Sequence, residues 1–219
     1  MPISHEQVQK AQPLAAAFFN RHPLEVAPDL IGKTVVFWSP EDVLLAGRIV
    51  ETEAYRWDEA GCHAWKNVHP DGKLRDPSLI SAALFDRPGT SYVYISYGLH
   101  WMLNVVCEPE GIGGGVLIRA IEPVLGVAAM QKNRVGVKNP KDLTNGPGKL
   151  CQALGINVSH HRKSLQEKPL ILAESLDEVA PHIGHSTRIG LAKGMGDDLP
   201  WRFFETQSRF VSKGKVSHF

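Results

Sequence analysis

The chain has 219 residues, of which 43% are apolar and 21% are charged, and 24 Lys and Arg against 23 Asp and Glu leave a net charge of +1. This length is enough to bury a substantial core, and the balance of charges excludes a histone-like polycation while allowing one basic face. No apolar run approaches the roughly 20 residues that span a membrane, and we expect no secretory signal.

The predicted elements begin with a helical segment over residues 1–20, which has capping-box spacing near its start. A short helix is expected over 23–32, because Pro suits the start of a helix and Gly its end. Residues 33–38 and 43–55 predict the two strands of a hairpin, since the residues between them, 39–42, are typical of a turn.

Residues 56–90 are rich in charge, Gly and Pro and predict a long loop with one short helix at 79–84. A loop of this length is usually functional or disordered. The rest of the chain predicts strands at 92–97, 99–106, 116–121, 170–173, 188–193 and 202–206 and helices at 124–134 and 147–154. We therefore expect one α+β domain, residues 1–219, built on an antiparallel sheet.

Two carboxylates mark the strand that ends at Tyr55. Alternation places Glu51, Glu53 and Tyr55 on one face, although Glu is depleted in strands. Either this is a solvated outer face, or a carboxylate works there beside a planar ligand. A Glu has a reference pKa near 4.3, so it is ionised at neutral pH and can take a proton from water.

His63 lies in the long loop and directly follows Cys62. The cysteines, Cys62, Cys107 and Cys151, lack CxxC spacing, which indicates free thiols in a reducing compartment. No second ligand pair has metal spacing, and catalytic Cys–His pairs meet in space rather than in sequence, so both a metal site and a nucleophile are disfavoured. A histidine that stacks on or hydrogen-bonds to a ligand fits better.

An aromatic hairpin is predicted around Gly98. Tyr92 and Tyr94 alternate with apolar residues, and Tyr97 falls at the tip, where a large ring cannot belong to the core. Such a ring either folds back on the surface or protrudes, and a protruding ring can wedge between bases. Arg119 interrupts a different, apolar strand, and a buried Arg needs an anionic partner. That partner is either a structural carboxylate such as Glu122 or the carboxylate of Glu53.

Together these segments resemble the alkyladenine DNA glycosylase family, also called 3-methyladenine DNA glycosylase. The resemblance extends from about Pro23 to the last strand, and its most specific strings are Gly-Arg-Ile-Val-Glu-Thr-Glu-Ala-Tyr and Tyr-Val-Tyr-Ile-Ser-Tyr-Gly. It implies a curved, mostly antiparallel sheet with surrounding helices and a protruding β-hairpin. It also implies a monomeric enzyme that flips an alkylated or deaminated purine out of double-stranded DNA and hydrolyses its N-glycosidic bond, without lyase activity.

The resemblance also implies roles for individual residues. Glu53 matches the base that activates water, and Arg119 the residue that holds that water and Glu53. The expected base pocket consists of Tyr55, His63, Tyr94, Asn104 and Leu117, and the expected intercalating residue is Tyr97. The DNA backbone is expected at Lys149, Ala192 and Lys193, near the main chain of Leu191. No metal or cofactor is implied, and the enzyme is expected inside the cell with the DNA, in the cytoplasm and nucleoid of a bacterium or the nucleus of a eukaryote.

Two other functions are compatible with parts of this pattern. The same scaffold could bind damaged or distorted DNA without catalysis, although a Glu53–Arg119 pair argues against that. A glycosidase acting on free nucleosides or sugars would use Glu51 and Glu53, but neighbours two residues apart on a strand do not flank a bond as sugar hydrolysis requires.

The near-neutral net charge is the sum of acidic and basic regions. Residues 25–61 hold eight acidic and three basic residues, whereas 130–150 hold five basic and one acidic, and 202–219 hold four basic and one acidic. The last two segments are expected to line the DNA phosphates.

Overall fold

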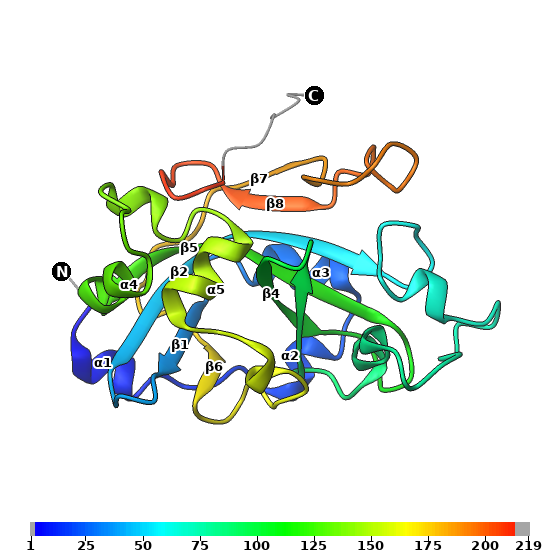
Figure 1. Ribbon diagram of the computed structural model, residues 1–219, viewed down its shortest axis with the longest axis horizontal. Coiled ribbons are helices and arrows are strands. Elements are labelled where there is room, and N and C mark those ends of the chain that lie inside the picture. The colour runs from blue at the N-terminus through cyan, green and yellow to red at the C-terminus, as the bar shows by residue number, and fades with distance from the viewer. Residues whose placement is uncertain (1–2, 213–219) are drawn as a thin grey trace.

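Strand β2 (Leu44–Arg56) runs through the centre of an eight-stranded sheet in the computed structural model, which describes residues 3–212 (Figure 1). One edge of β2 pairs first with β1 (Thr34–Trp38) and then with β8 (Arg202–Glu205). Its other edge pairs with β5 (Gly114–Leu125) from residue 46 to residue 56. Residues 51–53 are therefore enclosed by strands on both edges.

The remaining strands extend this sheet on either side. Its order is β3-β4-β5-β2-β1-β6, β8 pairs with both β2 and β7, and all these pairings are antiparallel. These strands are β3 (Ser91–Ser96), β4 (His100–Val106), β6 (Leu170–Ala173) and β7 (Ile183–Ser186). The predicted α+β class and antiparallel sheet are confirmed, and so is the hairpin of β1 and β2.

Short helices cover the sheet. In Figure 1, α5 lies in front of it and α3 behind it. Both helices bury apolar residues in the main core, which they share with strands β2, β4 and β5. The helices are α1 (His5–Gln9), α2 (Ala16–Phe19), α3 (Pro23–Asp29), α4 (Val127–Asn133) and α5 (Pro147–Leu154), and the 3₁₀ helices are η1 (Trp65–Asn67), η2 (Ile80–Phe85), η3 (Pro140–Asp142) and η4 (Val158–His160).

The prediction of one helix over residues 1–20 is wrong. The capping box at Ser4 begins α1 as expected, but the chain is not helical from residue 10 to 15. There Pro13 forms a bridge to Ala173, and the N–H of the buried Leu14 bonds to the carbonyl of Leu172 at 2.8 Å. Pro cannot donate to a helix, so pairing with the edge of β6 replaces the helical bonds.

A predicted strand at 188–193 is also wrong, because the strand lies at β7 instead. The segment after it turns at Gly190, which has a φ of +85°, and its Ile189 N–H bonds to a side chain rather than to a strand. The helix expected at 124–134 begins at Val127, since Val124 and Leu125 continue β5, and the short helix expected at 79–84 is the 3₁₀ helix η2.

A small second core orders the long segment between β2 and β3. Cys62, Val68 and Phe85 pack there against Tyr92 and Val106. The buried side chain of Asn67 holds the segment together, since its amide exchanges hydrogen bonds with the main chain of Asp76. The segment is thus an ordered part of the fold.

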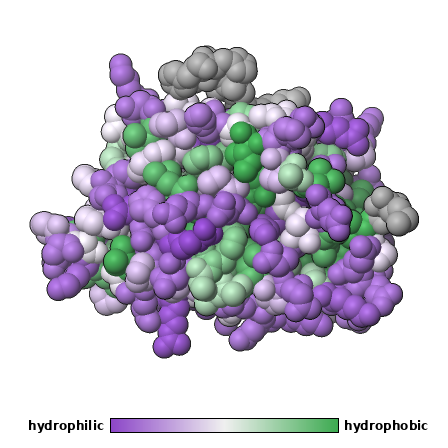
Figure 2. Space-filling model, turned by 180° about the vertical axis from the view of Figure 1, so that it is seen from behind, coloured by the Kyte–Doolittle hydropathy of each residue, from purple (hydrophilic) through white to green (hydrophobic). Residues whose placement is uncertain are grey.

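The surface of the molecule is mainly polar. Figure 2 shows the face opposite that of Figure 1, where apolar areas are separated by hydrophilic ones. Within residues 3–212, no helix combines the length and the apolar character that crossing a membrane requires.

Gly126 is a site where the fold requires glycine. Its φ is +79°, and an added Cβ would lie 2.3 Å from the Leu45 side chain. Gly155 has a similar φ of +80° with open space around it. We expect Gly155→Ala to lower the free energy of unfolding by about 1 kcal/mol through backbone strain alone, and Gly126→Ala to lose about 1–3 kcal/mol more through overlap. Urea unfolding of both variants measures the difference, and equal losses would contradict the overlap.

Candidate active site

A cavity of about 510 Å³ opens between the β3–β4 hairpin, the sheet and two loops. This volume is within the range of small-molecule sites. Strands β2, β3, β4 and β5 contribute side chains to it, and the loops contribute residues 61–63 and 189–191. Among its lining residues are all five of the predicted base pocket, namely Tyr55, His63, Tyr94, Asn104 and Leu117, together with Arg119 and Tyr97.

Aromatic rings form one wall. Tyr94 stacks on Tyr92, with ring centroids 5.2 Å apart and an angle of 25° between planes. The ring of His63 meets that of Tyr94 edge-on at 4.5 Å, and its Nδ1 is hydrogen-bonded to the Tyr92 hydroxyl at 2.8 Å. Burial lowers the pKa of His63, so the ring is neutral at neutral pH. Burial raises the pKa of Tyr94 to about 12, which keeps its hydroxyl protonated.

Two further side chains limit the cavity from the sheet. Asn104 of β4 is buried, and its Nδ2 donates to the carbonyl of Tyr92 at 3.0 Å. It pairs in register with Leu117 of β5, so both side chains reach the cavity from neighbouring strands. Cys62 also lines the cavity, but burial raises the pKa of its thiol to about 12. A neutral thiol is a poor nucleophile.

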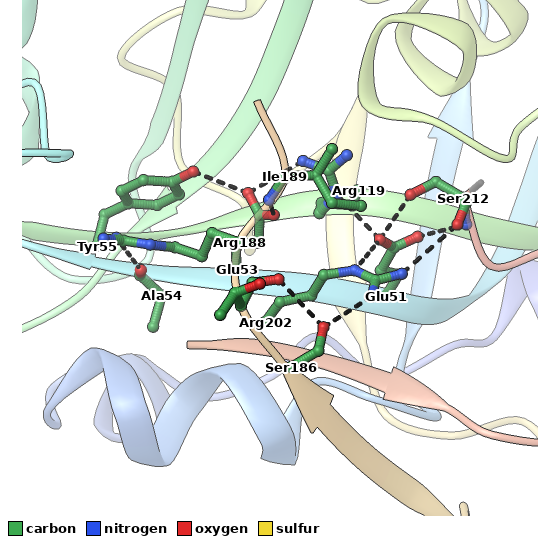
Figure 3. A network of polar contacts seen from close by, with 11 residues as sticks. Glu51, Glu53, Ala54, Tyr55, Arg119, Ser186, Arg188, Ile189, Arg202 and Ser212 are labelled. Atoms are coloured by element: carbon green, nitrogen blue, oxygen red, sulfur yellow. Dashed lines mark hydrogen bonds and ion pairs between the residues drawn. The ribbon is translucent and has the colours of Figure 1, made fainter. Parts of the chain in front are cut away.

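Glu53 lies directly beneath the lining of this cavity. Its side chain is completely buried, and its carboxylate accepts three hydrogen bonds. They come from the Tyr55 hydroxyl at 2.8 Å, from Arg119 Nη1 at 3.0 Å and from the main-chain N–H of Ile189 at 2.7 Å (Figure 3). All three donors belong to residues that line the cavity. The solvated outer face considered for Glu51 and Glu53 is therefore wrong.

A bulge brings Arg119 to both carboxylates. Glu51 pairs with Ala120 and Thr52 pairs with Ile118, which leaves Arg119 without a partner in the register. Such a bulge redirects a side chain, and here the guanidinium donates Nε to Glu51 and Nη1 to Glu53, each at 3.0 Å. Burial lowers the pKa of Arg119, but the two carboxylates outweigh it and raise that pKa, so the group stays charged.

Glu51 is the centre of a second, deeper set of bonds. Its carboxylate also accepts from Arg202 Nε at 2.7 Å and from the N–H and the hydroxyl of Ser212, both at 2.6 Å (Figure 3). Burial raises the pKa of Glu51, yet Arg119, Arg202 and the Ser212 bonds together hold it below its ordinary value. The sequence had placed Arg202 in a basic segment facing DNA, and this is wrong because the side chain is fully buried.

A buried ion pair that the sequence interpretation missed supports the pocket from behind. Arg188 Nη1 and Nη2 each donate to one oxygen of Glu59 at 2.7 Å, and Nη1 also donates to the carbonyl of Ala54 at 3.0 Å. The guanidinium lies 4.5 Å from the centre of the Tyr55 ring. The signal in the sequence is weaker here than for Arg119, because the polar residues 185–187 directly precede Arg188.

The hairpin tip carries exposed apolar side chains. Tyr97, with a φ of +50°, is 90% exposed, and Leu99 is 75% exposed. Of the two alternatives for Tyr97, protrusion is therefore confirmed.

The residues expected to contact the DNA backbone do not line the cavity but lie close in sequence to residues that do. Lys149 lies two residues after Pro147, and Ala192 and Lys193 are exposed directly after Leu191; both Pro147 and Leu191 line the cavity. The Lys149 ammonium donates to Asn145 at 2.6 Å. Of the basic segment 202–219, Lys213 and Lys215 lie outside the described residues. Within residues 3–212 we find no cluster of three His, Cys, Asp or Glu side chains that could hold a metal.

Comparison with known proteins gives a consistent result. Residues 17–209 match the family model described as methylpurine-DNA glycosylase. A protein of Salinibacter ruber assigned as a 3-methyladenine DNA glycosylase is 44% identical over 213 residues, covering 94% of this chain and 99% of the relative. Relatives with the same assignment are 43% identical in Rhodopseudomonas palustris, over 90% and 86% of the two chains, and 40% identical in Chlorobium luteolum, over 93% and 98%.

The lowered pKa of Glu51 predicts how stability depends on pH. A depressed carboxyl pKa stabilises the fold fully above the unfolded value of 4.5, and this contribution is lost as the pH falls through the folded value. Glu51→Gln leaves two buried guanidinium groups without this partner, which we expect to cost about 3–5 kcal/mol at neutral pH. The cost should stay constant well above pH 4.5 and shrink as the pH falls below about 4.5 in urea unfolding. A constant difference would contradict the ionised, paired state of Glu51.

Proposed function

The chain belongs to the methylpurine-DNA glycosylase family, and from this premise we propose that it hydrolyses the N-glycosidic bond of an alkylated purine, such as 3-methyladenine, in double-stranded DNA. The observation that carries the proposal is the buried carboxylate of Glu53, held by three donors directly beneath an aromatic cavity. Hydrolysis leaves an abasic site, which makes the chain a DNA repair enzyme.

Glu53 acts as the general base in this proposal. A carboxylate offers about four acceptor positions, and three donors leave one for water. The N-glycosidic electron pair leaves with the base, the water oxygen bonds to C1′ of the sugar, and the water proton passes to Glu53. The sugar is cation-like in the transition state, as in glycoside hydrolysis, and the negative charge of Glu53 stabilises it. Arg119 keeps the carboxylate oriented.

The aromatic cavity recognises the base. An alkylated purine carries positive charge, and rings such as those of Tyr55 and Tyr94 attract a cation over their faces. His63, neutral through burial, can stack without repelling that charge. Asn104 limits the space at the pocket edge, where we propose that it crowds the exocyclic amino group of normal guanine. Leu117 fills the apolar side.

A base inside a duplex hides its glycosidic bond, so the nucleotide must be flipped out at a cost of a few kcal/mol. We propose that Tyr97 offsets part of this cost by filling the gap in the stack. We propose that Lys149, Ala192 and Lys193, which lie close in sequence to the cavity-lining Pro147 and Leu191, make the phosphate contacts.

The reaction is proposed to be simple hydrolysis. A lyase needs an amine to form a Schiff base, and within residues 3–212 no lysine lines the cavity. Cationic bases leave readily and need little acid catalysis. Neutral lesions, such as the deaminated purine hypoxanthine, are weaker substrates in this scheme, because the lining Tyr94 hydroxyl and Cys62 thiol, with pKa values raised to about 12, are weak acids for protonating the leaving base.

We expect Glu53→Gln to bind lesion duplex while base release falls by about 10²–10⁴-fold, because the amide cannot accept the water proton. The assay measures single-turnover release of methylated purine with metal chelator present. Strand cleavage is compared with and without alkali, because alkali cuts the DNA at an abasic site, whereas a lyase would cut it without alkali. Glu108→Gln is the matched control, since Glu108 is a buried carboxylate paired with Arg56 outside the cavity. Wild type that binds but releases no base would support a non-catalytic binder instead.

We expect Tyr97→Ala to slow single-turnover release from duplex by roughly 5- to 150-fold, equivalent to the loss of one stacking contact. Tyr97→Phe keeps the ring and should retain the wild-type rate. Release from single-stranded DNA, where no stack must be opened, should be little changed in either variant. If Tyr97→Ala leaves the duplex rate unaltered, the tyrosine is not a wedge.

A further inference from the structure

Glu51 has no part in the chemistry proposed above, yet it is bonded more extensively than Glu53. It is completely buried and does not line the cavity. Its Oε1 accepts from Arg119 Nε, Arg202 Nε and the Ser212 hydroxyl, and its Oε2 accepts from the Ser212 N–H. Desolvating a carboxylate this deeply costs several kcal/mol, so its burial calls for an explanation in terms of the groups that it holds.

The geometry of Arg119 indicates what Glu51 does. A guanidinium is planar, and its N–H groups point in fixed directions. The bond from Nε to Glu51 and the bond from Nη1 to Glu53 therefore fix the plane of the group together. Without the first bond, Arg119 could rotate about its side chain and present Nη1 in other directions. The second bond, at 3.0 Å, depends on that orientation.

We propose that Glu51 is a positioning residue, which orients Arg119 so that this guanidinium holds the catalytic carboxylate of Glu53 in place. The inference rests on the function proposed above. Glu51 also takes a share of the positive charge of Arg119, and Arg202 supplies a second positive charge to the cluster. The charges of the two carboxylates and the two guanidinium groups therefore balance beneath the pocket.

The last described part of the chain belongs to this arrangement. Arg202 lies on β8, where it pairs in register with Glu53 and stands two residues before Phe204, the partner of Glu51, and its Nη1 donates to Ser186 of β7 at 2.9 Å. Ser212 holds the opposite side of the Glu51 carboxylate with two bonds of 2.6 Å. These contacts fix Glu51 from β7, β8 and the segment at residue 212, none of which lines the cavity. The positioning therefore reaches from residue 212 to the cavity through Glu51 and Arg119.

Single-turnover kinetics of Glu51→Gln test this inference on the full chain. The maximal rate of methylpurine release should fall about 10- to 100-fold, as misplacement of a catalytic group does, while the Kd for lesion duplex stays within about twofold of wild type. Glu205→Gln is the matched control and should retain the wild-type rate. Glu205 is a buried carboxylate of β8 that lies 3.5 Å from Arg48 and accepts from the N–H of His182, and among residues 3–212 it is bonded to neither Arg119 nor Glu53.

A double variant separates positioning from general loss of structure. If Glu51 acts through Arg119, adding Glu51→Gln to Arg119→Lys should lower the rate by less than about twofold beyond Arg119→Lys alone. The inference would be overturned if the rate of the double variant fell by the product of the two single-variant factors. A Glu51→Gln rate equal to that of Glu205→Gln would overturn it as well. Should Glu51→Gln not fold, Ser212→Ala removes one bond only and should lower the rate severalfold without changing Kd; an unchanged rate counts against the inference.

The two proposals fail in different ways. Wild type without base release removes the proposed function, and the positioning of Glu51 with it. If wild type is active, Glu53→Gln is inactive and Glu51→Gln has the same rate as Glu205→Gln, then only the positioning role of Glu51 is excluded and the proposed function stands.

Discussion

Two carboxylates of one strand lie in the interior of this protein, and their burial is the constraint on which the surrounding structure depends. Neither Glu51 nor Glu53 touches solvent, so each must be paired and hydrogen-bonded to remain charged. The bulge that leaves Arg119 unpaired in the sheet serves this need, as does β8, which brings Arg202 alongside β2. The two carboxylates have separate surroundings: the hydrogen bonds to the Glu53 carboxylate come from residues that line the cavity, and Glu51 links one of them, Arg119, to Arg202 and Ser212.

A second buried ion pair, between Arg188 and Glu59, lies against the ring of Tyr55. Arg188 links Glu59 of the long loop to the carbonyl of Ala54 in β2, and its guanidinium covers one side of Tyr55. The residue after it, Ile189, donates its N–H to Glu53. One buried pair thus joins both loops of the cavity to the central strand, which explains how irregular segments can present residues at fixed positions.

Most strands of the sheet and most side chains of the cavity could be predicted from the sequence, because strong local patterns were present. Alternation identified the strands with Glu53 and Tyr94, and the turn at Gly98 placed Tyr97 at a hairpin tip, although it left open whether the ring protrudes or folds back on the surface. Local patterns could not show that the chain near Pro13 pairs with β6, or that the segment after β7 turns at Gly190, since partners distant in sequence decide both. The same limit explains Arg202: a charged residue looks like surface until the opposing carboxylate, 151 residues away, is known.

The central claim is that the negative charge of Glu53 stabilises a sugar cation beneath the pocket. The most direct measurement compares the Kd of two duplexes, one with a cationic pyrrolidine in place of the sugar and one with neutral tetrahydrofuran. Wild type should prefer the cation by about 10²-fold or more, as enzymes prefer analogues of their transition states, and Glu53→Gln should lose most of that preference. An equal preference in both proteins would show that the charge of Glu53 does not act on the sugar and would contradict the account.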